Sequence, residues 1–216
     1  RDITMKQDLY PYQIDSVDSV FAEFNKGVKK TLLINPTGTG KTSIGAEIIS
    51  RFFEKEMRVL WLAHREELLF QAQQRIYDFT GYLGEIDKAE RVADISASII
   101  LASVQTLKGK RLERYPKDHF DLIIIDEAHH ASAASYKKII DYFISLLLGL
   151  TATPDRSDEK SLGDVFDSVA FQYSLIEAIK GGYLANIKGF QIKDFEIDLS
   201  ELRGATGKDY SDSELE

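Results

Sequence analysis

The sequence has 216 residues, is 44% hydrophobic and carries a net charge of −8. This suits one large domain, or one domain with a tail, and gives ample material for a core. The absence of cysteine excludes disulfides and thiolate metal sites and fits a reducing, cytoplasmic location. No apolar run approaches the ~18 residues of a membrane helix, so we expect no membrane partner. The chain starts without Met and ends in a polar stretch, so we expect a piece of a longer protein.

The negative charge is concentrated at the carboxyl end. Residues 193–216 contain eight acidic and three basic residues, so this segment carries −5 and the rest of the chain −3. A weakly acidic body still allows a local basic groove, so a nucleic-acid partner is not excluded.

The first predicted element is a helix over residues 13–24, which has apolar side chains along one face and is ended by Gly27. Tyr10 and Gln13 stand at its start. An aromatic ring can stack on adenine, and an amide can pair with the base edge. A helix-entry contact with a surface glutamine is the alternative, and these residues alone leave both open.

Residues 31–42 read TLLINPTGTGKT and form the centre of the chain. A short apolar strand at 31–34 leads into a glycine-rich turn, and residues 43–53 follow with helical spacing. This order of strand, turn and helix is typical of a phosphate-binding P-loop. The pattern has glycine where this chain has Asn35, but the G-x-G-K-T part is intact.

The residues of the turn explain its chemistry. Gly38 and Gly40 let successive backbone N–H groups point inward, and the helix that follows adds the positive end of its dipole. Lys41 can reach the β- and γ-phosphates, and the hydroxyl of Thr42 can bind Mg²⁺. The predicted nucleotide-binding residues of the turn are Thr37, Gly38, Thr39, Gly40, Lys41 and Thr42.

Two further strand–helix steps follow, with strands predicted at 57–63 and 98–104, a helix at 64–79, and a short strand and turn at 81–91. Polar side chains at the carboxyl ends of these strands suit a sugar–phosphate backbone. A solvated arginine and ordinary helix caps are the alternatives. The candidates are Arg65, Ser103, Gln105 and Thr106. A basic cluster then follows, usually a solvated loop but here a possible flank of a nucleic-acid path: Lys108, Lys110, Arg111 and Arg114.

The most apolar strand, predicted at 120–125, ends in Asp126 and Glu127. Together with a P-loop, this predicts that Asp126 holds Mg²⁺ through water and that Glu127 acts as general base for the attacking water. Acidic residues also favour helix starts, but that does not explain the apolar strand before them. His129 is interpreted as a polar relay toward the γ-phosphate. With four histidines and no cysteine in the chain, we expect no zinc site.

The remainder contains a predicted helix at 134–143 and a buried strand at 145–150, after which Thr151 and Thr153 could connect the Asp-Glu turn to a moving part. We expect a polar loop at 155–164, a strand at 169–173 and a helix at 174–180. Residues 187–197 alternate like a strand, and the chain from 199 onward is interpreted as a linker or tail.

Five segments then stand in a recognisable order, namely YPYQ, PTGTGKT, AHREELLFQ, DEAHH and TATP, with GLTATPDR, LGDVF and SLIEAIKGGYLAN further along. The chain resembles, over about residues 8–190, the first RecA-like domain of superfamily 2 helicases. It is most similar to DEAH-type enzymes related to XPB and to the helicase subunits of type I and type III restriction systems. The resemblance implies an α/β three-layer sandwich whose mostly parallel sheet has helices on both faces.

The resemblance also implies roles for individual residues. Gln13, with Tyr10 or Tyr12 beside it, reads adenine, and the P-loop binds ATP with Mg²⁺. Asp126 and Glu127 are the magnesium-binding and water-activating carboxylates, with Lys41 completing the site. Coupling of nucleotide state to movement falls to His129, Thr151 and Thr153. The resemblance favours DNA as the nucleic acid, and the implied contacts with its strand are Arg65, Ser103, Gln105 and Thr106.

Such enzymes need a second RecA-like domain, whose arginine finger is worth roughly 10³–10⁵ in rate in related NTPases. We expect a RecA-like domain over 1–190 and a linker or acidic tail over 191–216, toward a second domain that this chain lacks. The isolated chain should therefore hydrolyse ATP weakly or not at all. The leading function is the ATP-binding half of a DNA helicase or translocase. The alternatives are a duplex-translocating motor that does not separate strands and a nucleotide-gated clamp with little turnover.

Overall fold

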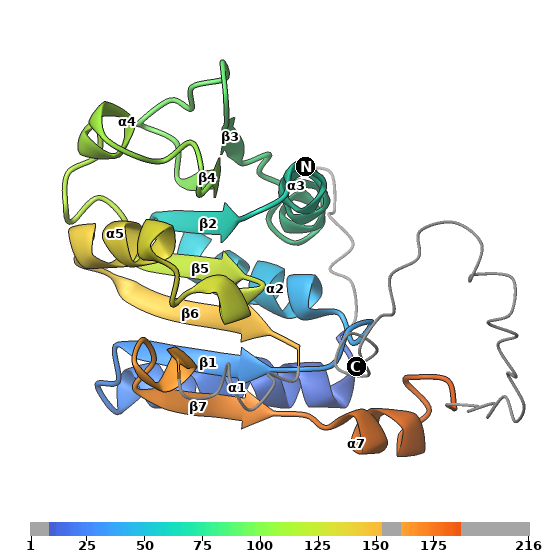
Figure 1. Cartoon of the computed structure of the whole chain (residues 1–216). Helices are drawn as coiled ribbons and strands as arrows, with labels where there is room; N and C mark the ends of the chain where they lie inside the picture. The colour runs from blue at the N-terminus through green and yellow to red at the C-terminus, as the bar shows by residue number, and fades with distance from the viewer. Residues whose placement is uncertain (1–8, 153–160, 187–216) are drawn as a thin grey trace, which may run out of the picture. The chain divides into compact units, whose positions relative to one another are not determined.

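The computed structural model describes residues 9–152 and 161–186 (Figure 1). The chain divides into two units, Arg1–Ala185 and Asn186–Glu216, and the fold below belongs to the first unit. Thr153 and the strand expected at 187–197 lie outside the described residues.

The centre of the fold is a seven-stranded sheet in which every described strand pair is parallel, with order β3-β4-β2-β5-β6-β1-β7. The strands of its middle are buried along most of their length, which explains their nearly continuous apolar sequences. The strands are β1 (Lys30–Ile34), β2 (Val59–Ala63), β3 (Glu85–Asp87), β4 (Ile99–Ser103), β5 (Leu122–Asp126), β6 (Leu146–Thr151) and β7 (Ser168–Gln172).

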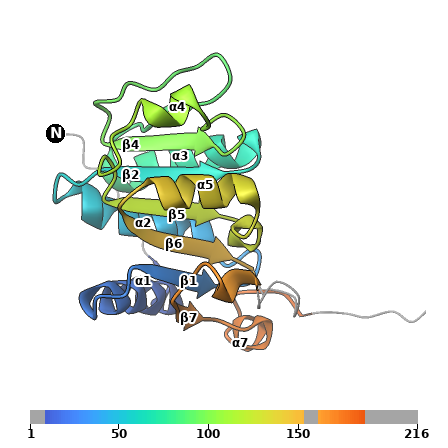
Figure 2. The same cartoon turned by 60° about the vertical axis from the view of Figure 1, so that its left-hand side comes forward.

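Helices cover both faces of this sheet, as Figure 2 shows. One face carries α1 (Pro11–Asn25), α2 (Lys41–Phe53) and α3 (Glu66–Thr80). The other carries α4 (Lys110–Glu113), the 3₁₀ turn η1 (Ala128–His130) and α5 (Ala134–Tyr142), and α7 (Leu175–Lys180) follows β7. This confirms the predicted three-layer α/β sandwich.

Each face has its own hydrophobic core. Trp61 on β2 is fully buried against α2, where a Cβ added to Gly45 would lie 2.6 Å from the indole ring. The close approach of the phosphate-loop helix to the sheet therefore depends on glycine at position 45. Such packing fixes the direction in which α2 leaves the P-loop.

Two local predictions were wrong. The polar loop expected over 155–164 contains helical residues at 161–163, because Leu162 and the following Val165 are buried against the sheet. The basic cluster, for which a solvated loop is the usual interpretation, contains the short helix α4 (Lys110–Glu113), in which Leu112 is buried. In both segments, buried apolar side chains among charged ones supply the contacts that order the backbone.

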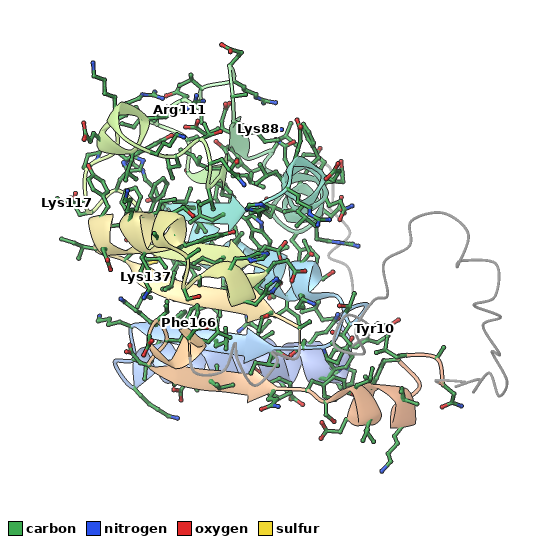
Figure 3. All side chains as sticks on the ribbon, viewed as in Figure 1. Tyr10, Lys88, Arg111, Lys117, Lys137 and Phe166 are labelled. Carbon is green, nitrogen blue, oxygen red and sulfur yellow. The ribbon has the colours of Figure 1, made fainter. Side chains whose placement is uncertain are left out.

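Arg111 of the basic cluster forms an ion pair and hydrogen bonds within the fold (Figure 3). Its Nε contacts Oδ1 of Asp87 at 2.5 Å, and its other nitrogens donate to the carbonyls of Ala89 and Arg91. Tyr115 donates its hydroxyl to Oδ2 of Asp87 at 2.7 Å. Arg111 thus holds the segment after β3.

Candidate nucleotide-binding site

The predicted catalytic segments meet at the carboxyl edge of the sheet. In the register of the central strands, Ile34 of β1 pairs with Thr151 of β6, and Asp126 of β5 pairs with Leu150 of β6. The P-loop after β1 and the carboxylates after β5 are therefore separated by one strand. Ligands of open parallel sheets bind at this edge, where the strand order reverses.

The P-loop has the backbone shape that its glycines predict. Gly38 and Gly40 have φ angles of +87° and +76°, a left-handed conformation that residues with side chains rarely adopt. Between them, Thr39 turns back on the loop, and its hydroxyl donates to the Pro36 carbonyl at 2.7 Å. The N–H of Asn35 donates to the Thr151 carbonyl at 2.9 Å, which ties the loop to β6.

Lys41 is folded over this loop. Its side chain is nearly buried, and Nζ donates to the Asn35 carbonyl at 3.3 Å. Burial lowers the pKa of Lys41, while the nearby charges of Glu127 and Asp126 act in the opposite direction. The side-chain amide of Asn35 is buried without a hydrogen-bond partner, at the position where the P-loop pattern has glycine. Lys41 is thus a partly desolvated cation, positioned to gain from an anionic ligand.

Asp126 is the buried carboxylate of the site, with 5% of its surface exposed. Its Oδ1 accepts the Glu127 N–H at 3.1 Å. Burial, and then the charge of Glu127, raise the pKa of Asp126 to about 6, although that N–H and Lys41 lower it. The negative charge of Asp126 is thus only partly compensated by neighbouring groups of the protein. A hard cation would supply the missing positive charge, so these residues fit the expected Mg²⁺.

Glu127 has a φ angle of +55°, which is unfavourable for a glutamate and is a form of strain often found at functional sites. Its side chain is about one-third exposed, and Oε2 lies 3.3 Å from Nδ1 of His129. The predicted general base is therefore accessible to water and is in contact with the predicted relay histidine.

A cavity of about 600 Å³ adjoins the P-loop on the side of α1. Gln13 forms part of its wall and connects two elements: Oε1 accepts the Tyr10 N–H at 3.0 Å, and Nε2 donates to the Thr39 carbonyl at 3.0 Å. Tyr12 donates its hydroxyl to the same carbonyl at 2.8 Å. A Cβ on Gly40 would lie 2.5 Å from Nε2 of Gln13, so glycine is needed here also for space.

Gln13 keeps capacity for a ligand despite these bonds. An amide oxygen has two lone pairs and an amide nitrogen two hydrogens, so each atom can make one more hydrogen bond. Adenine offers a matching pair, its N6 donor and N7 acceptor, whereas guanine offers two acceptors on that edge. The exposed ring of Tyr10, at the mouth of this cavity, lies nearly parallel to Tyr12.

The sequence did not reveal two aromatic contributors to the site. Tyr183, just after α7, lines the cavity. Tyr136 on α5 is buried, its hydroxyl has no hydrogen-bond partner, and burial together with the charges of Asp126 and Glu127 raises its pKa to about 12. An aromatic residue after the Gly181–Gly182 pair was the one available signal for Tyr183, whereas nothing local distinguished Tyr136 from a core residue.

The predicted nucleic-acid contacts follow β2 and β4. Arg65 is exposed and precedes α3 as its N-cap. Ser103 is buried and donates its hydroxyl to Oε1 of Gln105 at 2.5 Å, while Nε2 of Gln105 lies 2.7 Å from Nδ1 of His64. Thr106 accepts the Ala89 N–H at 3.3 Å. Ser103, Gln105 and Thr106 thus have hydrogen-bond partners within the protein, and Gln105 and Arg65 are the exposed members.

The residues predicted to couple the site differ in what the structure describes. Thr151 is buried at the end of β6, and its carbonyl accepts the Asn35 N–H. Thr153 lies outside the described residues. The ring centroids of His129 and His130 are 4.0 Å apart, and that of His130 lies 5.5 Å from His64. A series of contacts therefore runs from Glu127 to Gln105.

A parallel sheet with a P-loop after one central strand, and an Asp-Glu pair after another, defines a P-loop NTPase of the RecA-like type. The family model described as "Type III restriction enzyme, res subunit" matches residues 6–156, and the chain belongs to this family.

Relatives agree with this assignment. The chain is 34% identical over 209 residues to the Escherichia coli type I restriction enzyme EcoAI endonuclease subunit, covering 91% of this chain and 25% of that protein. It is 34% identical over 218 residues to the putative ATP-dependent helicase IRC3 of Saccharomyces cerevisiae, covering 94% and 31%. The chain thus spans between a quarter and a third of these relatives.

Solved structures show the same fold. The Sulfolobus solfataricus SWI2/SNF2 ATPase core in complex with double-stranded DNA is similar with a TM-score of 0.61 at 21% identity, covering 77% of this chain and 37% of that one. The UvsW helicase of bacteriophage T4 gives 0.57 at 21% identity, covering 77% and 61%. Within the described residues, no helix is long and apolar enough to cross a membrane.

Proposed function

We propose that this chain is the ATP-binding half of an ATP-dependent DNA helicase or translocase. The observation that supports this most strongly is the convergence of Lys41 with the buried Asp126 and the strained Glu127 at one edge of the sheet. A module that only bound nucleotide would need the lysine but not a general base.

The residues divide the work of hydrolysis between them. Gln13 and Tyr10 hold the adenine, and the backbone from Thr37 to Thr42, with the Lys41 ammonium, binds the phosphates. Thr42 and Asp126 would hold Mg²⁺, which neutralises phosphate charge when bound. Glu127 accepts the proton of the attacking water, and its contact with His129 holds the carboxylate in place.

The track is proposed from the relatives and from the exposed polar edge. A DNA 3'-5' translocase, XPB2 of Sulfurisphaera tokodaii, is 27% identical over 206 residues. Arg65 and Gln105 are the exposed side chains among the predicted nucleic-acid contacts. The contacts from Glu127 through His129, His130 and His64 to Gln105 provide a route for coupling, together with Thr151 and Thr153.

We further propose that residues 1–190 form the first RecA-like domain and that 191–216 lead toward a second one, which completes the site. Similarity to a type I restriction endonuclease subunit favours, as a second candidate, a motor that moves along duplex DNA without separating the strands. A strand-separation assay on a forked duplex, run beside a triplex-displacement assay, discriminates the two motors.

The test of the proposed function is the Glu127→Gln variant of the complete protein, with the exposed Glu67→Gln on α3 as a matched loss of charge. ATP hydrolysis is measured with no polymer, with single- and double-stranded DNA, and with RNA. A motor shows DNA-stimulated hydrolysis that Glu127→Gln reduces by about 10²–10⁴-fold with ATP binding retained. ATP binding without hydrolysis that any polymer stimulates, or a Glu127→Gln variant that behaves like Glu67→Gln, would point to a nucleotide-gated clamp.

A further inference from the structure

We propose that Tyr183 is a base-contacting residue of the nucleotide pocket and that the turn over residues 181–184 forms its second wall. The ligand is the purine base of a nucleoside triphosphate, so this inference rests on the proposed nucleotide site. It adds a carboxyl-terminal element to a pocket that the sequence placed on residues 10–42.

The turn is folded back onto α7 by backbone hydrogen bonds. Ser174 and Glu177 form a reciprocal cap at the start of α7, and the Ala178 carbonyl accepts the N–H groups of Tyr183 and Leu184 at 2.9 and 3.1 Å. Gly182 has a φ angle of +76°, the left-handed conformation that suits glycine. These bonds fix the direction in which Tyr183 leaves the turn.

Glycine is needed in the turn for space as well. A Cβ added to Gly181 would lie 2.8 Å from the ring of Tyr183, closer than real Cβ contacts. The ring therefore occupies the volume that a larger residue would take. The turn is built around this side chain, which remains only half-buried.

The ring of Tyr183 meets two tyrosines at the cavity. Its centroid lies 4.6 Å from Tyr12 and 5.0 Å from Tyr10, with interplanar angles of 63° and 60°. Tyr12 is immobilised because it donates to the Thr39 carbonyl and stacks on Tyr173 at 4.6 Å and 7°. The three cavity tyrosines thus form a corner and not a closed stack, which leaves aromatic surface for a planar base.

The same turn contacts the phosphate loop. A Cβ added to Gly38 would lie 3.2 Å from Cδ2 of Leu184, so these residues are in close contact. Tyr183 and Gln13 line one cavity, which also reaches Gly38 and Gly40. A base held between Gln13 and Tyr183 would therefore be placed directly beside the loop that binds the phosphates.

The experiment compares base-dependent with phosphate-dependent binding in the complete protein. Affinities for ATP and for inorganic triphosphate are measured by competition with a fluorescent ATP analogue. The variants are Tyr183→Ala and Tyr183→Phe, with Tyr173→Ala as the matched control. Tyr173 packs on Tyr12 as closely as Tyr183 does but is not part of the cavity wall.

Tyr183→Ala is expected to weaken ATP binding by about 5- to 100-fold, the range for one lost base–aromatic contact, and to leave triphosphate binding unchanged. Tyr183→Phe keeps the ring and should bind ATP within about twofold of wild type. Tyr173→Ala should change the ratio of the two affinities less than Tyr183→Ala does. Tyr183→Leu, which keeps an apolar side chain without a ring, repeats the test if the alanine variant unfolds.

The inference is overturned if Tyr183→Ala leaves ATP affinity unchanged, or weakens ATP and triphosphate equally, because the second result would indicate a purely structural role. Failure of the proposed nucleotide site is distinguishable from both. In that case the wild-type protein itself binds neither ATP nor triphosphate.

Discussion

Asp87 and Asp126 are both buried and both stand at the last position of a parallel strand, yet their surroundings differ. Asp87 ends β3, and its two oxygens contact Arg111 and the Tyr115 hydroxyl at 2.5 and 2.7 Å. Asp126 ends β5, accepts a backbone N–H, and has a pKa raised to about 6 by burial and by Glu127.

The difference separates a structural carboxylate from one that we propose to be functional. The protein supplies a side-chain donor to each oxygen of Asp87, which connects β3 to the chain around α4. Asp126 shares its surroundings with a second acid and with a lysine that is itself partly desolvated. A buried charge without a compensating partner lowers the stability of the fold. Such a charge is typical of sites where a ligand supplies the opposite charge.

The largest expected effect is on the structural side. Asp87→Asn should lower the free energy of unfolding by about 3–5 kcal/mol, because Arg111 loses its buried partner. Chemical denaturation of this chain measures the change, and Asp15→Asn, at an exposed position on α1, is the control. A loss below about 1 kcal/mol would show that the Asp87–Arg111 pair stabilises the fold no more than an ordinary surface ion pair does.

Asp126→Asn should act in the opposite direction. A pKa near 6, against an ordinary value near ~3.9, corresponds to about 3 kcal/mol of unfavourable interaction. The substitution removes this unfavourable interaction, but it also removes a negative charge that stabilises the neighbouring Lys41 ammonium. We therefore expect a net gain of about 1–3 kcal/mol in the free energy of unfolding without ligand at pH 7. The same denaturation experiment measures this gain. A destabilised Asp126→Asn variant would show that the charge of Asp126 is compensated within the protein as fully as the charge of Asp87.

The gain should depend on pH. Asp126 has a higher pKa in the folded than in the unfolded protein, so its ionisation disfavours folding above about pH 6 and has no effect below about pH 4, where both states are protonated. The difference between Asp126→Asn and wild type should therefore shrink between pH 6 and pH 4. Thermal unfolding of both proteins in a pH series measures it, and a constant difference would contradict this assignment.

The smallest effect is expected for Tyr115→Phe, which removes one hydroxyl from the Asp87 cluster. The unpartnered Oδ2 should lower the free energy of unfolding by about 1–2 kcal/mol, less than Asp87→Asn does. Denaturation of Tyr115→Phe, Asp87→Asn and the double variant should show non-additive losses, since the two residues share one hydrogen bond. Additive losses would indicate that the hydroxyl does not stabilise Asp87.

Local sequence patterns predicted most of this fold. The continuous apolar strands, the glycines of the P-loop and the Asp-Glu pair after β5 are each encoded within a few residues, and the structure brings them to one edge. The partner of Arg111 and the cavity wall formed by Tyr183 were missed because they depend on contacts 24 and 171 residues away along the chain, at Asp87 and Tyr12. Periodicity contains no information about such contacts.

The central claim is that the charge of Asp126 is not fully compensated within the protein, which leaves this carboxylate available to the cation that accompanies a nucleotide. Its most direct test is the unfolding temperature of wild type and Asp126→Asn, each measured without ligand and with a non-hydrolysable ATP analogue in either Mg²⁺ or EDTA. We predict that Asp126→Asn is the more stable protein without ligand and loses the Mg²⁺-dependent part of the stabilisation, which in wild type reaches about 2.7 kcal/mol at a hundredfold excess over Kd. An Asp126→Asn variant that is less stable without ligand, or that keeps the full Mg²⁺-dependent stabilisation, would contradict the claim.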